Sequence, residues 1–222
     1  MTYSYDYPHP AVTTDIVIFT VQDNALCLLL IRRGEAPYKG KWALPGGFLR
    51  MDEDIEHCAA RELAEEAGVQ GVYLEQLATF GAVDRDPRER VISVAYYALI
   101  PSDDVALQAG TDAAEAQWFP LSDLPPLAFD HSDIVRMAQQ RLSAKMSYST
   151  IGLQFMPAAF TLSDLQRVYE IASGKTLDKR NFRKWVLSLD LVEETGQKQT
   201  QGAHRPAMLY RVKKPSRIDI IK

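Results

Sequence analysis

The sequence is poor in cysteine and lacks long apolar runs. Its two cysteines, Cys27 and Cys58, stand in an apolar, strand-like run and in a helix-forming stretch. They have neither a metal-binding spacing nor the density that small secreted domains show, so we expect both to be reduced packing residues. No apolar run reaches the roughly 18 residues of a membrane span, and the first residues are polar and aromatic rather than a charged and then apolar leader. We therefore expect a cytoplasmic protein with no membrane partner.

The formal net charge of −4 conceals an uneven distribution. Residues 1–146 contain 12 Lys and Arg against 22 Asp and Glu, a charge of −10, whereas residues 147–222 contain 13 against 7, a charge of +6. A polar stretch at residues 147–150 makes the best boundary, so we predict two domains, at residues 1–147 and 148–222. A basic domain beside an acidic one indicates contact with nucleic acid.

Most of the expected chemistry lies in one acidic stretch. Asp54 is the predicted N-cap of a helix over residues 55–67, which ends at Gly68. Three carboxylates at positions i, i+3 and i+4 leave one face of this helix within about 6 Å of one another, and they belong to Glu62, Glu65 and Glu66. Oxygen ligands clustered without an interleaved lysine suit Mg²⁺ or Mn²⁺. The alternative is an ordinary solvated acidic face.

The wider pattern favours the metal site. Gly47, five residues, Glu53, seven residues and then Arg61-Glu62-Leu63-x-Glu65-Glu66-x-Gly68-Val69 together resemble the complete signature of the Nudix hydrolases. The resemblance implies an α/β fold, a Nudix α/β/α sandwich with a mixed sheet. It also implies that water cleaves the diphosphate of a nucleoside diphosphate derivative with the help of bound divalent cations.

The resemblance assigns roles to individual residues. Arg61 is implied to pair with Glu53, which also helps to position a water at the metal. Gly46 and Gly47 let the backbone approach the metal or a phosphate, where a Cβ would obstruct it. The implied catalytic residues are Glu53, Arg61 and Glu62, and the implied metal ligands are Glu62, Glu65 and Glu66.

A second group of candidates lies in the loop at residues 81–89, between predicted strands at residues 72–80 and 90–100. Guanidinium groups suit phosphate and ribose oxygens, so Arg85 and Arg88 are candidate substrate-binding residues. The alternative is a solvated hairpin tip. The run from Asp84 to Arg88 and the strand after it resemble the ADP-ribose branch of the Nudix group, which implies ADP-ribose or a related compound as the ligand.

Other residues of the first domain receive simpler interpretations. Predicted strands at residues 12–21 and 25–32 form a hairpin, and Trp42 and Leu44 are expected to brace the sheet. Glu115 is a candidate extra metal ligand or base from a distant loop. His131, at the start of a helix predicted to run to about residue 145, has no His or Cys near it, so we expect a capping or packing role.

The basic domain begins with a helix that Thr161 and Asp164 cap and that ends at Gly174. A second helix at residues 178–189 and two strands, at residues 191–193 and 207–212, follow it. Helix, turn, helix and hairpin describe a winged helix whose second helix suits a DNA major groove, with Lys198, His204 and Arg205 on the wing. The predicted DNA-binding residues are Lys179, Arg180, Asn181, Arg183, Lys184 and Arg205.

A basic helix is often only a solvated surface. Here, however, residues 179–184 and 205–207 resemble the Nudix-related transcriptional regulators of NAD metabolism, which join a Nudix domain to a C-terminal winged helix. Two hypotheses follow. The chain is an ADP-ribose or nucleoside diphosphate-sugar pyrophosphatase with an accessory or dimerising basic domain, or it is an ADP-ribose-responsive regulator that binds duplex DNA. The regulator can have hydrolytic turnover or be a sensor without it. A homodimer is expected because winged-helix sites are commonly symmetric.

Overall fold

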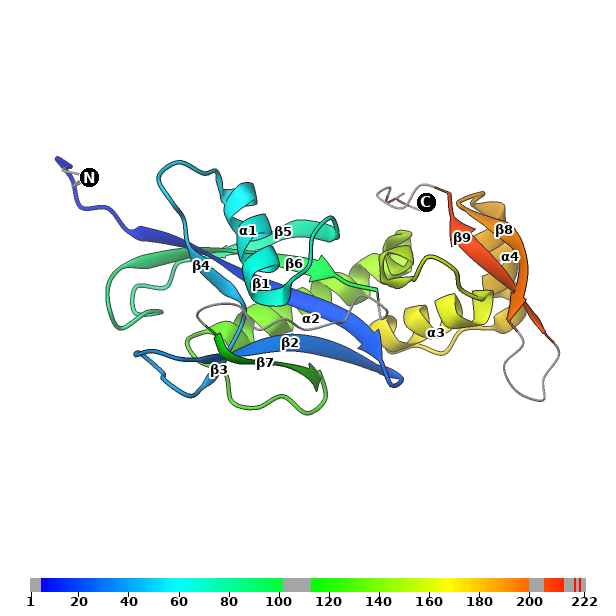
Figure 1. Ribbon diagram of the computed structural model, residues 1–222, viewed down its shortest axis with the longest axis horizontal. Helices are drawn as coiled ribbons and strands as arrows, with labels where there is room; N and C mark the ends of the chain where they lie inside the picture. The colour runs from blue at the N-terminus through cyan, green and yellow to red at the C-terminus, as the bar shows by residue number, and fades with distance from the viewer. Residues whose placement is uncertain (1–4, 102–112, 200–205, 214–217, 219, 221–222) are drawn as a thin grey trace. The chain divides into compact units, whose positions relative to one another are not determined.

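The computed structural model describes residues 5–101, 113–199, 206–213, 218 and 220 of the chain (Figure 1). The chain divides into two compact units. One comprises Met1–Phe19, Leu28–Ala98 and Ala106–Ala138, and the other comprises Thr20–Cys27, Leu99–Val105 and Gln139–Lys222. No helix among the described residues is long and apolar enough to span a membrane.

The first part of the chain forms a seven-stranded sheet. Its path runs β3-β2-β1-β6-β5, while β4 pairs with β1 and β7 pairs with β2. The strands are β1 (Ala11–Gln22), β2 (Ala25–Arg33), β3 (Trp42–Ala43), β4 (Gly46–Phe48), β5 (Tyr73–Phe80), β6 (Val91–Leu99) and β7 (Ala113–Pro120). The predicted first hairpin is present, and its turn residues Asp23 and Asn24 both have positive φ, as tight hairpin turns require.

Helix α1 (Ile55–Ala67) has the predicted ends. His57 N donates to Asp54 Oδ1 over 2.8 Å, so Asp54 satisfies one of the amides that have no partner within the helix. At the other end Gly68 is left-handed, with φ 67°, and its amide donates to Ala64 O. A glycine adopts this conformation without a Cβ penalty, which explains where the helix ends.

Neighbouring residues of β1 contact different helices. Thr14 Oγ1 lies 3.4 Å from Cys58 Sγ of α1, whereas Asp15 Oδ1 lies 3.5 Å from His131 Nε2 in the first turn of α2 (His131–Tyr148). Because successive side chains of a strand point to opposite faces, α1 and the start of α2 cover opposite sides of the sheet (Figure 1). The predicted α/β/α sandwich with a mixed sheet is therefore confirmed.

The C-terminal part contains the predicted winged helix. Helix α3 (Leu162–Ser173) begins with a capping box formed by Thr161 and Asp164. Helix α4 (Lys179–Ser188) follows, and the antiparallel strands β8 (Val192–Gln199) and β9 (Ala207–Val212) form the hairpin. The centroids of the Tyr169 and Trp185 rings lie 5.3 Å apart, so aromatic packing joins α3 to α4.

Several elements differ from the prediction. Strand β8 was predicted to end at residue 193 but continues to Gln199, because cross-strand pairing with β9 outweighs its polar composition. Strands β3, β4 and β7 were not predicted, and a 3₁₀ helix at Ile151–Phe155 precedes the winged helix. The first two strands are too short to produce a periodic pattern in the sequence.

Candidate functional site

The acidic face of α1 is held together by Arg61. Its Nε and Nη2 donate to the two oxygens of Glu53 over 2.9 and 2.6 Å, so the predicted pair is present. Its Nη1 donates to Glu62 Oε1 over 2.6 Å and to Glu65 Oε2 over 3.0 Å. One guanidinium group thus bridges three carboxylates, two of which belong to the predicted metal-ligand set.

These contacts change the acidity of the groups. Hydrogen bonds from Arg61 lower the pKa of Glu53 to about 2. Burial raises the pKa of Glu62, and the guanidinium of Arg61 only partly offsets that effect. Hydrogen bonding to Glu53 is the largest cause of the raised pKa of Arg61. Glu53 is therefore ionised across the physiological pH range, whereas Glu62 carries the desolvation penalty.

The two glycines of β4, Gly46 and Gly47, place backbone without side chains beside these carboxylates. Gly46 pairs with Asp15 and Gly47 with Thr14 in the antiparallel register of β4 and β1. The amide of Gly46 donates to Glu66 Oε2 over 2.9 Å. A Cβ on Gly47 would overlap the Glu62 carboxylate, so glycine is required for this close approach.

The donor set suits a hard divalent cation. Glu62, Glu65 and Glu66 supply only carboxylate oxygens from one helix face, which is the chemistry that Mg²⁺ and Mn²⁺ prefer. Within the described part of the chain, no three His, Cys, Asp or Glu side chains converge on a point that would hold a metal ion. The guanidinium of Arg61 pairs with Glu62 and Glu65 in place of a metal ion. The residues fit a cation, provided that carboxylates now bonded to Arg61 turn toward it.

A cavity of about 120 Å³ lies beside Gly46, and acidic, basic and aromatic side chains line it. Its residues come from β1, β2, β4, β6, the loops before β4 and β6, and the start of α2. The lining consists of Thr13, Asp15, Ile31, Arg33, Leu44, Gly46, Phe48, Arg85, Asp86, Arg88, Val91, Phe129 and His131. The cavity is smaller than a typical small-molecule site of about 300 Å³ or more, so it can enclose only part of a nucleotide.

The structure gives the two predicted substrate-binding arginines different environments. Arg85 is buried, with its side chain 4% exposed, and its Nη2 lies 2.7 Å from Asp130 Oδ1 and 3.1 Å from Asp15 Oδ2. Arg88 stands at the rim, with its side chain 40% exposed, and pairs with Asp86 over 2.7 Å. Both line the cavity and both are paired with carboxylates, but only the guanidinium of Arg85 is itself buried.

Asp15 connects this cavity to His131. Besides Arg85, its carboxylate accepts a hydrogen bond from Ser93 Oγ over 2.5 Å. The buried His131 accepts a hydrogen bond at Nδ1 from Leu44 N over 2.9 Å, which leaves the proton on Nε2, 3.5 Å from Asp15. Burial lowers the pKa of His131 below its ordinary value. The packing role expected for His131 is present, together with a hydrogen bond that the sequence did not indicate.

The remaining candidates of the first domain are placed as follows. Glu115, on β7, is about half exposed and lies 3.4 Å from Arg32. The Trp42 ring packs edge-on against Phe119 with centroids 4.8 Å apart, and Leu44 is buried, as expected for residues that brace the sheet. Sequence reasoning gave no site role to Asp15 and Asp130, because their partner Arg85 is distant in the sequence. It also missed Arg33, whose place in the cavity depends on the fold.

The predicted DNA-binding face of α4 is exposed. Phe182 and Val186 are buried and Trp185 packs against Tyr169, whereas the basic side of the helix is turned to solvent. No ion pair joins its four cations to a carboxylate in the part of the chain that the structure describes. The exposed predicted residues are Lys179, Arg180, Asn181, Arg183 and Lys184. Arg205 and His204 lie outside the described residues, and Lys198 is exposed on β8.

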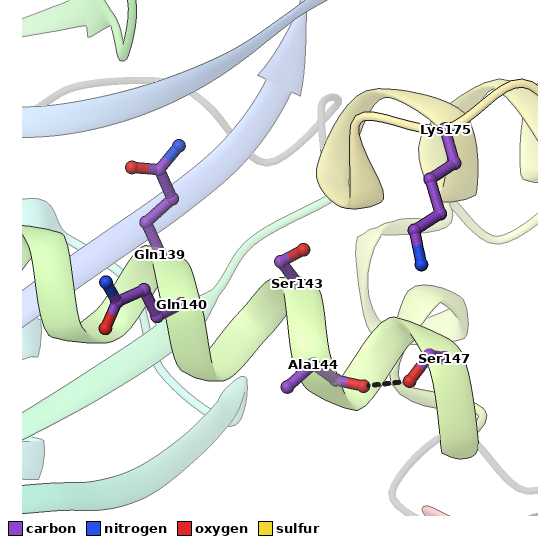
Figure 2. A pocket seen from close by; sticks show the side chains of 6 residues that line it. All are labelled: Gln139, Gln140, Ser143, Ala144, Ser147 and Lys175. Atoms are coloured by element: carbon purple, nitrogen blue, oxygen red, sulfur yellow. Dashed lines mark hydrogen bonds between the residues drawn. The ribbon is translucent and has the colours of Figure 1, made fainter.

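A second hollow lies between α2 and the end of α3 and is lined by amide and hydroxyl groups (Figure 2). Gln139, Gln140, Ser143 and Ser147 come from α2, and Lys175 supplies the one charge. Ser147 Oγ donates to Ala144 O over 2.7 Å, so this hydroxyl is used within its own helix. The hollow contains no carboxylate and no group suited to activate water.

Comparison with known families identifies both parts of the chain. The family model described as NUDIX domain matches residues 9–138. The family model described as NrtR DNA-binding winged helix domain matches residues 152–212.

Three relatives illustrate the similarity. The ADPR responsive transcriptional repressor NtrR of Acinetobacter baylyi is 42% identical over 211 residues, which cover 93% of this chain and 83% of that protein. The ADP-ribose pyrophosphatase of Methanocaldococcus jannaschii is 42% identical over 130 residues, covering 59% of this chain and 73% of that protein.

The third relative, Shewanella oneidensis NrtR, is similar in structure. Its complex with a 27mer DNA is matched with a TM-score of 0.84 and 39% identity over 92% of this chain and 94% of that chain. The complex of its NUDIX domain with ADP ribose is matched with a TM-score of 0.55 and 38% identity over 62% and 94%.

Arg85 should be required for stability. Arg85→Ala leaves the carboxylates of Asp15 and Asp130 without their guanidinium partner, and breaking such a buried pair costs about 3–5 kcal/mol of unfolding free energy. Denaturant titration should show this loss. Arg32→Ala serves as the control, because its pair with Glu115 is half exposed on both sides and contributes at most about 1 kcal/mol. Equal stability of the two variants would contradict this account of the buried pair.

His131 should make stability depend on pH. Its pKa is lower in the folded protein than the ordinary value of about 6.5, so unfolding takes up a proton once the pH falls below that value. Its contribution is fully present above about pH 6.5 and is lost as the pH falls through the folded-state pKa. The destabilisation caused by His131→Asn should therefore be larger at pH 7.5 than at pH 5.5, as measured by urea unfolding. A difference that does not vary with pH would exclude a neutral buried His131.

Proposed function

The chain belongs to the Nudix family and carries the winged helix of its NrtR regulators, and we propose that it is an ADP-ribose-responsive transcriptional repressor that also hydrolyses ADP-ribose. The observation that carries this proposal is that one chain contains both the acidic helix α1, with every residue of the Nudix signature, and the exposed basic helix α4. The relatives named above include a repressor responsive to ADP-ribose and an ADP-ribose pyrophosphatase, which supports both activities.

The hydrolytic step assigns a task to each residue around α1. Members of the family generally use divalent metals, and we propose Mg²⁺, with Mn²⁺ as a substitute, held by Glu62, Glu65 and Glu66. A bound cation supplies charge neutralisation at the diphosphate and activation of water. Arg61 fixes the position of Glu53, whose ionised carboxylate can orient a water molecule and accept a hydrogen bond from it. Gly46 and Gly47 keep the adjacent backbone clear of side chains.

The ligand occupies the cavity beside Gly46. Arg88 stands at its rim and presents a guanidinium to phosphate or ribose oxygens, whereas Arg85 acts through the buried carboxylates that it orients. The wall of Phe48 and Phe129 offers apolar rings beside these charges. Aromatic surface with a few placed charges is typical of nucleotide sites.

The winged helix binds duplex DNA. Helix α4 carries Lys179, Arg180, Asn181, Arg183 and Lys184 on its exposed side, which suits phosphate contacts around a major groove, and Arg205 belongs to the wing. We further propose that the protein acts as a homodimer on paired half-sites of operators near genes of NAD metabolism. ADP-ribose changes repression only if it binds the free and DNA-bound protein with different affinity.

Replacing one metal ligand should separate catalysis from folding. Glu66→Gln removes a charged ligand and should lower the Mg²⁺-dependent hydrolysis of ADP-ribose by at least about 100-fold, because metal neutralisation of the diphosphate is worth several kcal/mol. The melting temperature should change little. Glu56→Gln on the same helix is the matched control and should retain activity. Wild-type activity in Glu66→Gln would remove this residue from the site, and an inactive wild type would end the enzymatic part of the proposal.

Two cations of α4 should control the salt dependence of DNA binding. Each phosphate contact contributes about 0.9 units to the slope of log K against log salt, so Arg180→Ala with Lys184→Ala should remove about two units if both contact phosphates. Fluorescence anisotropy with operator and unrelated duplexes, with and without ADP-ribose, measures this slope. The control, Arg136→Ala with Arg141→Ala, makes the same change in net charge on α2. Weak DNA binding that does not change with DNA sequence, ADP-ribose or mutation would contradict the regulatory part of the proposal and leave only the hydrolytic part.

A further inference from the structure

The cavity beside Gly46 contains three arginines, and two of them are neutralised. Arg85 pairs with Asp15 and Asp130, and Arg88 pairs with Asp86. Arg33, at the end of β2, has no carboxylate within ion-pair distance among the residues that the structure describes. It is the cation of this cavity whose charge is left for a ligand.

The guanidinium of Arg33 is nevertheless held in place. Its Nε donates to Pro37 O over 2.8 Å, and its Cζ lies 4.8 Å from the centroid of the Phe129 ring. A planar guanidinium that is fixed at Nε and stacked on a ring loses little further entropy when it binds. The hydrogen bond to Pro37 uses one of its five N–H groups, so the Nη side still has donors for an acceptor.

A second guanidinium approaches the same ring. Arg88 Cζ lies 6.0 Å from the Phe129 centroid and 5.4 Å from that of Phe48. Burial, followed by the charge of Arg88, lowers the pKa of Arg33. Two like charges around one aromatic ring repel, and an anion bound between them would remove that repulsion.

We infer that Arg33 binds an anionic oxygen of the ligand's diphosphate and, together with Arg88, forms a pair of guanidinium groups supported by Phe129. This inference rests on the proposed function, because it assigns the diphosphate of ADP-ribose to a particular part of the cavity. It adds to that function a residue that determines affinity for the anion. The alternative is that Arg33 only packs on Phe129.

The neighbouring residue provides a matched control. Arg32 and Arg33 point to opposite faces of β2, since side chains alternate along a strand. Arg32 is half exposed, and its Nη1 lies 3.4 Å from Glu115 Oε2 rather than in the cavity. Arg32→Met and Arg33→Met therefore make the same chemical change one residue apart. Methionine retains an unbranched apolar side chain, so packing on Phe129 is largely kept while the charge is lost.

The experiment measures the binding of ADP-ribose and of inorganic pyrophosphate by calorimetry with the full chain. Divalent cations are chelated so that ADP-ribose is not cleaved. Loss of one charge-assisted contact is worth about 1.5–3 kcal/mol, so Arg33→Met should raise the Kd of both ligands by about 10- to 100-fold. Arg32→Met should leave both values within about twofold of the wild type, as expected for an exposed pair outside the site.

The outcomes separate the inference from the proposed function. If Arg33→Met and Arg32→Met bind both ligands as the wild type does, Arg33 only packs and the inference is wrong. If the wild type binds pyrophosphate through Arg33 but does not bind ADP-ribose, the anion site stands and the proposed ligand is wrong. If Arg33→Met does not fold, Arg33→Lys keeps the charge but loses the guanidinium fork. It should weaken pyrophosphate binding by about tenfold, and unchanged binding would contradict the inference.

Discussion

The acidic face of α1 depends on the guanidinium of Arg61. Carboxylates three and four residues apart on one helix face repel each other, and Glu62 in addition is largely buried. Arg61 compensates for both effects, because it donates to Glu53, Glu62 and Glu65 at once. The same contacts keep the loop before α1 against the helix. A cation that entered this site would take over part of the neutralisation that Arg61 now provides, so metal binding and the position of Arg61 are physically linked.

Strand β1 lies between this acidic face and the cavity beside Gly46 on the other side of the sheet. Thr14 faces α1 and Asp15 faces the cavity, and each is paired with one glycine of β4. Gly46 and Gly47 leave no room for a side chain between the two regions, because a Cβ on either would overlap atoms of Thr14 or Glu62. The carboxylates of α1 and the arginines of the cavity can therefore lie next to each other although different faces of the sheet supply them.

Sequence reasoning succeeded where the determinants are local. The ends of α1 and α3 follow from Asp54, Gly68 and Thr161, whose contacts lie within four residues. Short strands such as β3 and β4 were missed because they depend on pairing with other strands. Strand β3 pairs with β2, about 10 positions away, and β4 pairs with β1, about 30 positions away. Arg85 and Arg88 were both predicted to contact ligand. Arg85 differs from Arg88 in its environment, because it pairs with Asp15 and Asp130, which are 70 and 45 residues away in the sequence. The signal for Arg33 is that no carboxylate of the described residues lies within ion-pair distance of it, and no sequence pattern contains that signal.

A protein that both senses and cleaves one ligand is subject to a kinetic constraint. ADP-ribose shifts the DNA-binding equilibrium only through the difference between its affinities for the two states, so the largest effect it can have is fixed by that difference. Cleavage removes bound ligand and keeps occupancy below the equilibrium value whenever turnover is as fast as dissociation. Contacts that bind ADP-ribose without promoting its cleavage raise occupancy and leave the turnover of the bound ligand unchanged. Arg33 and Arg88 line the cavity rather than the acidic face of α1. A guanidinium that binds the diphosphate equally well before and during its cleavage is suited to that role, and the response to ligand can then be set separately from the rate at which the ligand is destroyed.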